Sequence, residues 1–184
     1  MKTDTINRQI AEPYATALMG LAQDQNLVDG IAQDMQGILA AVNGSTDLSR
    51  LLASPIMPDR IKKQVWQTLF PDLQPLTRNF ISLLIDKGRI MFLRDIATEF
   101  QALVRAQKNI ALAEVTTATP LSEAQITALK QKVMEITGAQ AVEVEIAIDP
   151  SLIGGVVIKL GSQIIDASIK GQLRRISSRL LASV

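Results

Sequence analysis

The sequence predicts a two-domain protein: an all-α amino-terminal bundle of about six helices over residues 1–108, and a small α+β carboxyl-terminal domain over residues 109–184. Two observations predict this division. Apolar residues recur every three or four positions through the first part, which is the period of helices that bury one face. After Asn109 the period falls to two and β-branched residues become frequent, as in half-buried strands. This change of period marks the expected domain boundary.

Short amphipathic segments separated by helix breakers define the first domain. The first predicted helix covers residues 5–23, and Pro13 predicts either a kink or a helix that begins near Glu12, because proline removes a backbone hydrogen bond. Five further helices are predicted at residues 27–42, 48–53, 58–70, 76–87 and 89–108. In the helix at 76–87, spacing places Phe80, Leu83 and Leu84 toward the core. The short connections between these segments are typical of a helical bundle.

The second domain is predicted to have the element order β-α-β-β-β-α. Its strands are expected at residues 110–119, 142–148, 156–160 and 163–166, and its helices at 122–137 and 168–182. Ser122 and Gln125 have the spacing of a capping box, which satisfies free amides at a helix start. The last helix is expected to bury an apolar stripe made of Ile169, Leu173, Ile176 and Leu180.

The strand at 142–148 alternates apolar residues with Glu143 and Glu145. Two carboxylates on one strand face are the side chains that a carboxylate enzyme or a divalent-ion site requires. A solvated outer face is the favoured interpretation, because a half-buried strand alternates in this way. The opposite face, predicted to be the buried one, holds Val142, Val144, Ile146 and Ile148.

Gly154 and Gly155 are a diglycine of the kind that phosphate-binding loops contain. A phosphate loop places its glycines between a strand and the amino end of a helix, where amides converge. Here the glycines lead into the strand at 156–160, and neither a Gly-Lys-Ser/Thr nor a G-x-G-x-x-G pattern follows. Backbone geometry is therefore the favoured explanation for the pair.

The composition restricts the chemistry of the chain. It contains no histidine and no cysteine, so Ser-His-Asp triads, thiol nucleophiles and the usual zinc sites are excluded. The net charge is +1, which provides no general attraction for nucleic acid or an anionic membrane. No run of about 18 apolar residues predicts a transmembrane helix. Composition leaves carboxylate and lysine catalysis open. The acids are nevertheless scattered along helices as solvated-face residues are, and we expect no enzymatic activity, no cofactor, no metal site and no small-molecule substrate.

Basic residues are concentrated in the last helix, at Lys170, Arg174, Arg175 and Arg179, and no acid follows Asp166. A solvated basic face is the favoured interpretation of such a group. A partner-binding face comes next and nucleic-acid binding last, because aromatic residues, which stack single-stranded bases, make up only 3% of the chain.

Three segments resemble the delta subunit of F-type ATP synthases, a family related to the mitochondrial oligomycin-sensitivity-conferring protein. They are Pro-Tyr-Ala-Thr-Ala-Leu at 13–18, the segment 78–90, and the segment 148–170. The last is the most specific, and it holds the family signature residues Asp149, Gly154, Gly155, Lys159, Gly161 and Asp166. Many relatives have a basic residue where this chain has Pro13, which makes it similar to the cyanobacterial and chloroplast branch.

The resemblance implies a non-enzymatic stator that keeps the catalytic head from turning with the central shaft. It implies that the amino-terminal bundle binds the amino-terminal helices of alpha subunits and that the carboxyl-terminal domain binds b- and b′-type peripheral-stalk subunits. It implies neither nucleic-acid binding nor direct membrane insertion. The amino end shows no transit-peptide pattern, so we expect a peripheral protein on the cytoplasmic (stromal-side) face of the thylakoid membrane. The alternative location is the cytoplasmic face of a bacterial plasma membrane.

An alpha-subunit helix needs an apolar groove between two helices of the bundle. The candidate residues lie on the first and fifth helices, namely Tyr14, Ala17, Leu18, Leu21, Phe80, Ile81, Leu84 and Ile85. These stripes are wide enough to serve both core and groove, and plain core is the favoured interpretation of each. Tyr14, with an apolar ring and a polar tip, is expected at the rim. Leu84→Asp is expected to weaken head binding while the carboxyl-terminal domain stays folded. The alternative function is a nucleic-acid-binding adaptor that uses the basic last helix.

Overall fold

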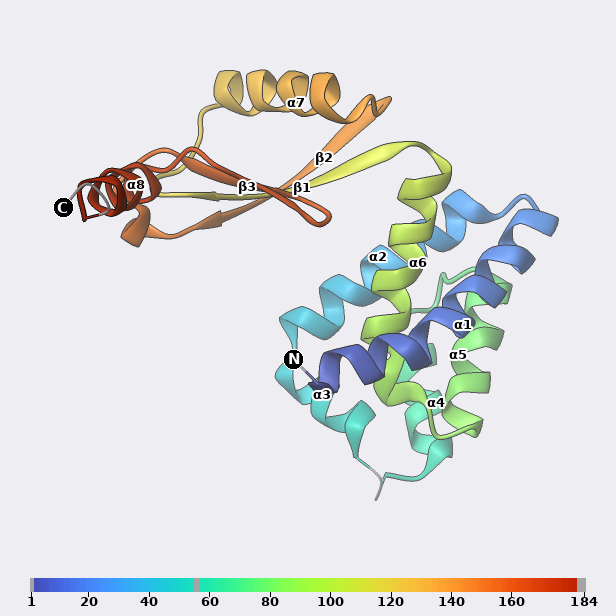
Figure 1. Cartoon of the computed structure of the whole chain (residues 1–184). Coiled ribbons are helices and arrows are strands. Elements are labelled where there is room, and N and C mark those ends of the chain that lie inside the picture. The colour runs from blue at the N-terminus through green and yellow to red at the C-terminus, as the bar shows by residue number, and fades with distance from the viewer. Residues whose placement is uncertain (1, 55–56, 182–184) are drawn as a thin grey trace. The chain divides into compact units, whose positions relative to one another are not determined.

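The computed structural model describes residues 2–54 and 57–181, and the side chains of residues 7–52, 54 and 57–176. The chain divides into two compact units, residues 1–104 and 105–184. The division falls inside the last helix of the first unit, slightly before the predicted boundary after residue 108. In Figure 1 the first unit is built of helices, and the second is a small sheet with helices.

The described part of the first unit is an all-α bundle, as predicted. Its α-helices are α1 (Lys2–Asp24), α2 (Val28–Gly44), α3 (Thr46–Ala53), α4 (Asp59–Leu69), α5 (Pro75–Asp86) and α6 (Leu93–Gln107). Ser45 caps α3 by accepting a hydrogen bond from the Leu48 amide at 3.2 Å. One core cluster joins the helices, and its largest fully buried side chains include Leu18, Ile31, Met35, Ile38, Leu84, Ile96 and Phe100.

A helix start near Glu12, one of the two alternatives predicted from Pro13, and the single helix predicted at 89–108 were both wrong. The helix α1 begins well before Glu12 and continues through Pro13, because the buried face formed by Ala11, Ala15 and Leu18 packs on both sides of the exposed proline. The single helix predicted at 89–108 is a short 3₁₀ turn, η1 (Ile90–Phe92), followed by α6. Gly88, with φ +63°, turns the chain there, and the Arg89 amide donates to the Leu84 carbonyl at 2.8 Å.

The second unit has the predicted element order. It contains β1 (Ile110–Thr117), α7 (Glu123–Thr137), β2 (Ala141–Ile148), the 3₁₀ turn η2 (Pro150–Leu152), β3 (Val156–Leu160), β4 (Gln163–Asp166) and α8 (Ile169–Leu181). The sheet order is β2-β1-β3-β4, with β1 parallel to β2 and the other pairs antiparallel. The predicted capping box at Ser122 and Gln125 is present. Figure 1 shows α7 along the sheet and α8 at the end opposite the β3–β4 turn.

The sheet has one covered and one open face. On the covered face, Val133 of α7 packs with Ala113, Val115 and Val142. The predicted alternation of β2 is correct, because Glu143 and Glu145 are exposed on the other face. The prediction that the whole apolar set is buried was wrong, since Ile146 is 41% and Ile148 is 55% exposed. The core side chains of α7 pack near the first half of β2 and do not extend over its last residues.

Candidate docking surfaces

The eight residues predicted to form a helix-binding groove do not share one surface. Five of them lie in the core, with exposures of 8% or less: Leu18, Phe80, Ile81, Leu84 and Ile85. Three reach the surface of α1, where Leu21 is 47% exposed, Ala17 is exposed and Tyr14 is half-buried. These three lie on one side of the helix, because residues three and four apart are neighbours on its surface.

Sequence reasoning missed Leu83, which is 46% exposed although its spacing placed it with the core. The buried arc of α5 is centred on Thr77, Ile81 and Leu84, and at 100° per residue Leu83 lies outside that arc. Met91, in η1, is 57% exposed. The apolar surface of this part of the bundle is therefore made by residues beside the predicted stripe.

Tyr14 is fixed in place by Arg89, from the connection between α5 and η1. An Arg89 guanidinium N–H donates to the Tyr14 hydroxyl, and the guanidinium carbon lies 5.4 Å from the ring centroid. A cation over an aromatic face adds to the hydrogen bond. The pair holds the Tyr14 side of α1 close to the carboxyl end of α5.

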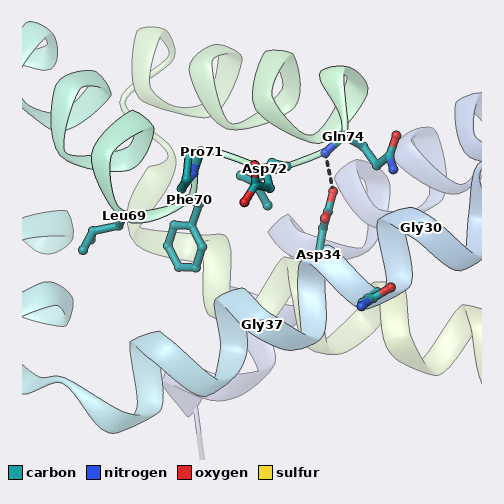
Figure 2. A pocket seen from close by; sticks show the side chains of 10 residues that line it. Gly30, Asp34, Gly37, Leu69, Phe70, Pro71, Asp72 and Gln74 are labelled. Atoms are coloured by element: carbon teal, nitrogen blue, oxygen red, sulfur yellow. Dashed lines mark hydrogen bonds between the residues drawn. The ribbon is translucent and has the colours of Figure 1, made fainter.

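A hollow of about 380 Å³ lies between α2 and the connection from α4 to α5. Figure 2 shows Asp34 pointing from α2 toward the backbone nitrogen of Gln74. The Asp34 carboxylate accepts from that nitrogen at 2.9 Å and from the Thr77 hydroxyl at 2.6 Å. It therefore caps the amino end of α5, where a negative charge is stabilised by the free amides. Asp34 is used structurally, and the other carboxylate that lines the hollow, Asp72, is exposed.

The family signature residues build the corner that leads into α8. Asp149 accepts from the Ser151 amide at 2.9 Å, and Asp166 accepts from the Ser168 amide at 2.9 Å and its hydroxyl at 2.6 Å. Gly155 has φ +79°, and a Cβ on it would lie 2.4 Å from the Ala167 carbonyl oxygen. The diglycine thus permits close approach of two backbone segments, as its favoured interpretation predicted.

The remaining two signature residues belong to the β3–β4 hairpin and the open sheet face. Gly161, with φ +58°, forms the hairpin turn. The Lys159 ammonium lies 2.8 Å from the Glu114 carboxylate on the neighbouring strand. All six signature positions therefore have a local structural use in the carboxyl-terminal unit.

Two carboxylates of this corner have lowered pKa values. The Ser168 hydroxyl and amide, and to a smaller extent Arg175 and Arg174, lower the pKa of Asp166 below its ordinary value of 3.8. The Ser151 amide and hydroxyl likewise lower the pKa of Asp149. A lowered pKa in the folded state means that the unfolded chain binds the proton more tightly. These two carboxylates therefore stabilise the fold above pH 3.8, and their contribution is lost as the pH falls through the folded-state pKa values.

We expect hydrogen exchange of the Ser168 and Gly171 amides to accelerate as the pH falls below about 4, after correction for intrinsic exchange rates. Asp166→Asn should remove most of this pH dependence, because the amide side chain cannot take up the proton. Asp72→Asn, at an exposed position of the first unit, is the control and should leave the dependence unchanged. Equal acid sensitivity in the parent and the Asp166 variant would contradict the assignment.

The helix α8 packs in the opposite way from the prediction. Two small residues face inward, namely Ser168 just before the helix and Gly171 within it. A Cβ on Gly171 would lie 2.3 Å from the Asp166 carboxylate. The stripe predicted to be buried points outward: Ile169 is 43%, Leu173 is 54% and Ile176 is 54% exposed. The side chain of Leu180, predicted with them, lies outside the described residues. We call Ile169, Leu173 and Ile176 the α8 stripe.

An apolar groove of about 500 Å³ runs between α7 and β3. We call it the α7–β3 groove; its apolar lining includes Leu121, Ala128, Leu129, Ile153, Val156 and Ile158. Ile153 is 65% exposed and has φ +68°, an unfavourable conformation for a β-branched residue. Gly154 also lines the groove, and a Cβ on it would lie 2.7 Å from Ile169. The groove therefore adjoins the α8 stripe.

The two carboxylates predicted on one strand face are open to solvent. Glu143 and Glu145 lie on an exposed strand face, and Arg105 lies 3.6 Å from the Glu143 carboxylate. Within residues 2–54 and 57–181, acidic side chains form no group of three or more that would hold a metal ion. Over the same residues, every helix is too short or too polar to cross a bilayer. The exposed apolar surfaces are therefore the candidate functional sites.

Comparisons with known proteins agree with these features. Residues 10–180 match the family described as ATP synthase delta (OSCP) subunit. The chain is 46% identical to ATP synthase subunit delta of Gloeothece citriformis over 181 residues, or 98% of each chain. It is 45% identical to the Synechocystis sp. protein of that name, again over 98% of each chain.

The fold is also shared with a solved structure. A chain in the cryo-EM structure of the Toxoplasma gondii mitochondrial ATP synthase hexamer superposes with a TM-score of 0.78 at 23% identity, covering 93% of this chain and 97% of that one. At this identity the likeness concerns the fold. The family match and the two cyanobacterial relatives extend over nearly the whole length, and the chain belongs to the ATP synthase delta (OSCP) subunit family.

Proposed function

We propose that this protein is a peripheral-stalk connector of an F-type ATP synthase. It links the alpha subunits of the catalytic head to the b- and b′-type stalk subunits, so that rotation of the central shaft is coupled to ATP synthesis. The observation that carries the proposal is the family match over residues 10–180. A chain that holds two neighbours needs separate docking surfaces, and exposed apolar side chains are present in both units.

In the first unit, the head-binding surface is formed by Tyr14, Ala17 and Leu21 of α1 together with Leu83 of α5. The Tyr14–Arg89 pair presents this side of α1 in a fixed position. An amphipathic helix from an alpha subunit would lay its apolar residues on these side chains. The five buried members of the predicted groove support the surface from beneath.

The head-binding surface is tested by titrating the full chain with a peptide of the alpha-subunit amino terminus. We expect a tight complex by calorimetry, and Leu21→Asp plus Leu83→Asp to weaken it by roughly tenfold to a hundredfold, because two exposed apolar contacts become charged. Leu69→Asp, at a 51% exposed position on α4, is the matched control and should bind like the parent. No heat with the parent chain would contradict this half of the proposal.

In the second unit, the stalk-binding surface lies around α8. Its supporting observation is the outward apolar face of that helix. A tagged chain should recover both the catalytic head and the stalk subunits from solubilised membranes. Recovery of neither would contradict the connector as a whole.

The same observations argue against the alternative of nucleic-acid binding through α8. Two of the exposed cations are engaged within the unit, because Lys170 donates to the Ser151 hydroxyl at 3.1 Å and Arg175 donates to the Asp166 carbonyl at 3.4 Å. The exposed stripe between these groups is apolar. We place the complex on the cytoplasmic (stromal-side) face of the thylakoid membrane, in keeping with the cyanobacterial relatives.

A further inference from the structure

We propose that the free edge of β2 accepts an extended strand from a partner, and that this strand alternates apolar with basic side chains. The sheet order β2-β1-β3-β4 leaves β2 at one edge. This surface goes beyond the proposed connector, which uses α1 with α5 and the region around α8. A sheet edge is extended by strand addition, in which main-chain hydrogen bonds provide affinity and alternate side chains provide specificity.

The backbone groups of β2 divide into a paired and an unpaired set. The Asp149 amide, directly after the strand, donates to the Thr117 carbonyl of β1 at 2.8 Å. Because alternate residues of a strand direct their backbone groups to the same side, the odd-numbered residues of β2 also face β1. The backbone groups of Val144, Ile146 and Ile148 therefore face away from the sheet. The described part of the chain makes no hydrogen bond to these outward groups.

The side chains of the same residues show that this edge is also open on the face of α7. Ile146 is 41% and Ile148 is 55% exposed, whereas Val142, at the start of the strand, is 9% exposed and packs with Val133 of α7. The strand has 8 residues and contains neither proline nor lysine, which commonly protect edge strands. An added strand that pairs with the second half of β2 would place its apolar side chains beside the two isoleucines.

Charge on the other face of the sheet selects basic side chains in the partner. The cross-strand register places Lys159, Glu114 and Glu145 in one row. The Lys159 ammonium lies 2.8 Å from the Glu114 carboxylate, whereas exposed Glu145 forms no ion pair with the described residues. Like charges directly opposite each other are destabilising, so the two adjacent acids favour a cation on the free side of Glu145. A lysine or arginine of the added strand would occupy that position.

A second copy of this chain fits the edge less well than a basic strand does. On the face opposite α7, β2 carries Glu143 and Glu145 between two alanines. Pairing of two β2 strands would therefore bring acids together and supply no cation. Charges on edge strands commonly oppose such self-association. The two glutamates act against a second copy and in favour of a strand of opposite charge.

The experiment titrates the full chain with the peptide acetyl-Lys-Val-Lys-Val-Lys-Val-Lys-amide and follows hydrogen exchange by NMR. In the free chain, the amides of Ile146 and Ile148 should exchange faster than that of Ala147, which faces β1. The peptide should slow exchange at Val144, Ile146 and Ile148, because these amides gain acceptors. Equal exchange along β2 in the free chain would overturn the assignment of the free edge. Peptide binding without slower exchange at the three amides would overturn strand addition.

Variants of the chain and of the peptide test the chemistry of the partner. Glu145→Lys is expected to weaken binding roughly tenfold, because a cross-strand attraction becomes a repulsion; equal binding would overturn the choice of a basic strand. The fold should persist, since Glu145 is exposed. Asp24→Lys, the same charge reversal at an exposed position of α1, is the matched control and should bind like the parent.

Two N-methylated peptides test the main-chain pairing, one methylated at its valines and the other at its lysines. Only alternate residues of an added strand face β2, so one of the two peptides should lose binding, and equal binding by both would overturn strand addition. The free chain should sediment as a monomer; a dimer with slow exchange at Ile146 and Ile148 would overturn the proposal in favour of a second copy. Absence of binding by the unmethylated peptide would overturn the β2 site and leave the connector in place, since recovery of head and stalk from membranes tests the connector separately.

Discussion

Leu84→Asp is expected to unfold the amino-terminal bundle, costing at least about 4 kcal/mol in the free energy of unfolding. Leu84 is 0% exposed and lies in the core cluster with Leu18 and Phe100. The substitution removes its packing and buries a carboxylate without a partner. The sequence placed this residue both toward the core and among the groove candidates. In the structure it is core, so a loss of head binding by the variant would follow from loss of the fold.

The measurement is chemical denaturation followed by Trp66 fluorescence. Trp66 is the single tryptophan of the chain and is 4% exposed in α4, so its emission reports the first unit. Leu83→Asp is the adjacent control and should change the stability by no more than about 1 kcal/mol, because that side chain points to solvent. A Leu84 variant as stable as the Leu83 variant would refute the assignment of Leu84 to the core.

Gly155→Ala is expected to destabilise the carboxyl-terminal unit by about 2–4 kcal/mol. The added Cβ would meet the Ala167 carbonyl oxygen at 2.4 Å and the Ser168 Cα at 2.9 Å, and the backbone has φ +79°. Both neighbours are backbone atoms, so neither can move aside without shifting the start of α8. The α8 stripe would then lose its orientation.

Gly161→Ala is the matched control for this change. Gly161 also has a positive φ, of +58°, but nothing lies within 4 Å of its Cβ position. It should cost only about 1 kcal/mol, the conformational penalty alone. The stability of both variants is measured by hydrogen exchange of the β3, β4 and α8 amides. Trp66 fluorescence should stay constant, because Trp66 lies in the first unit. An equal loss of stability for the two substitutions would show that the close approach at Gly155 does not affect the stability of the unit.

Much of the fold could be predicted because its signals are local. The capping box of Ser122 with Gln125 depends on neighbouring residues alone, and it is present as predicted. The start of α1 could not be read from Pro13, because packing of Ala11 and Ala15 in the core outweighs the local cost of the proline. The break before α6 was missed because η1 continues the apolar spacing of the helix that follows it.

The candidate docking surfaces were predicted less well than the fold. An apolar stripe indicates that something covers that face, but it does not say whether the cover comes from the same chain. Leu84 is covered within the bundle, whereas Leu83 and Leu173 face solvent. The signal that would have found the α8 surface is the small-residue face at Ser168 and Gly171, which identifies the side that packs closely.

By itself, the sequence determined the two-part architecture, the element order, the family signature, and the absence of histidine and cysteine chemistry. Each of these follows from residue types and short spacings. The tertiary structure alone decided which apolar faces are buried: Leu84 inward, and Ile153 with the α8 stripe outward. Burial is a relation between segments far apart in the chain. The close approach of Gly155 to Ala167, which holds α8 with its apolar face outward, therefore became visible only when those segments were placed together.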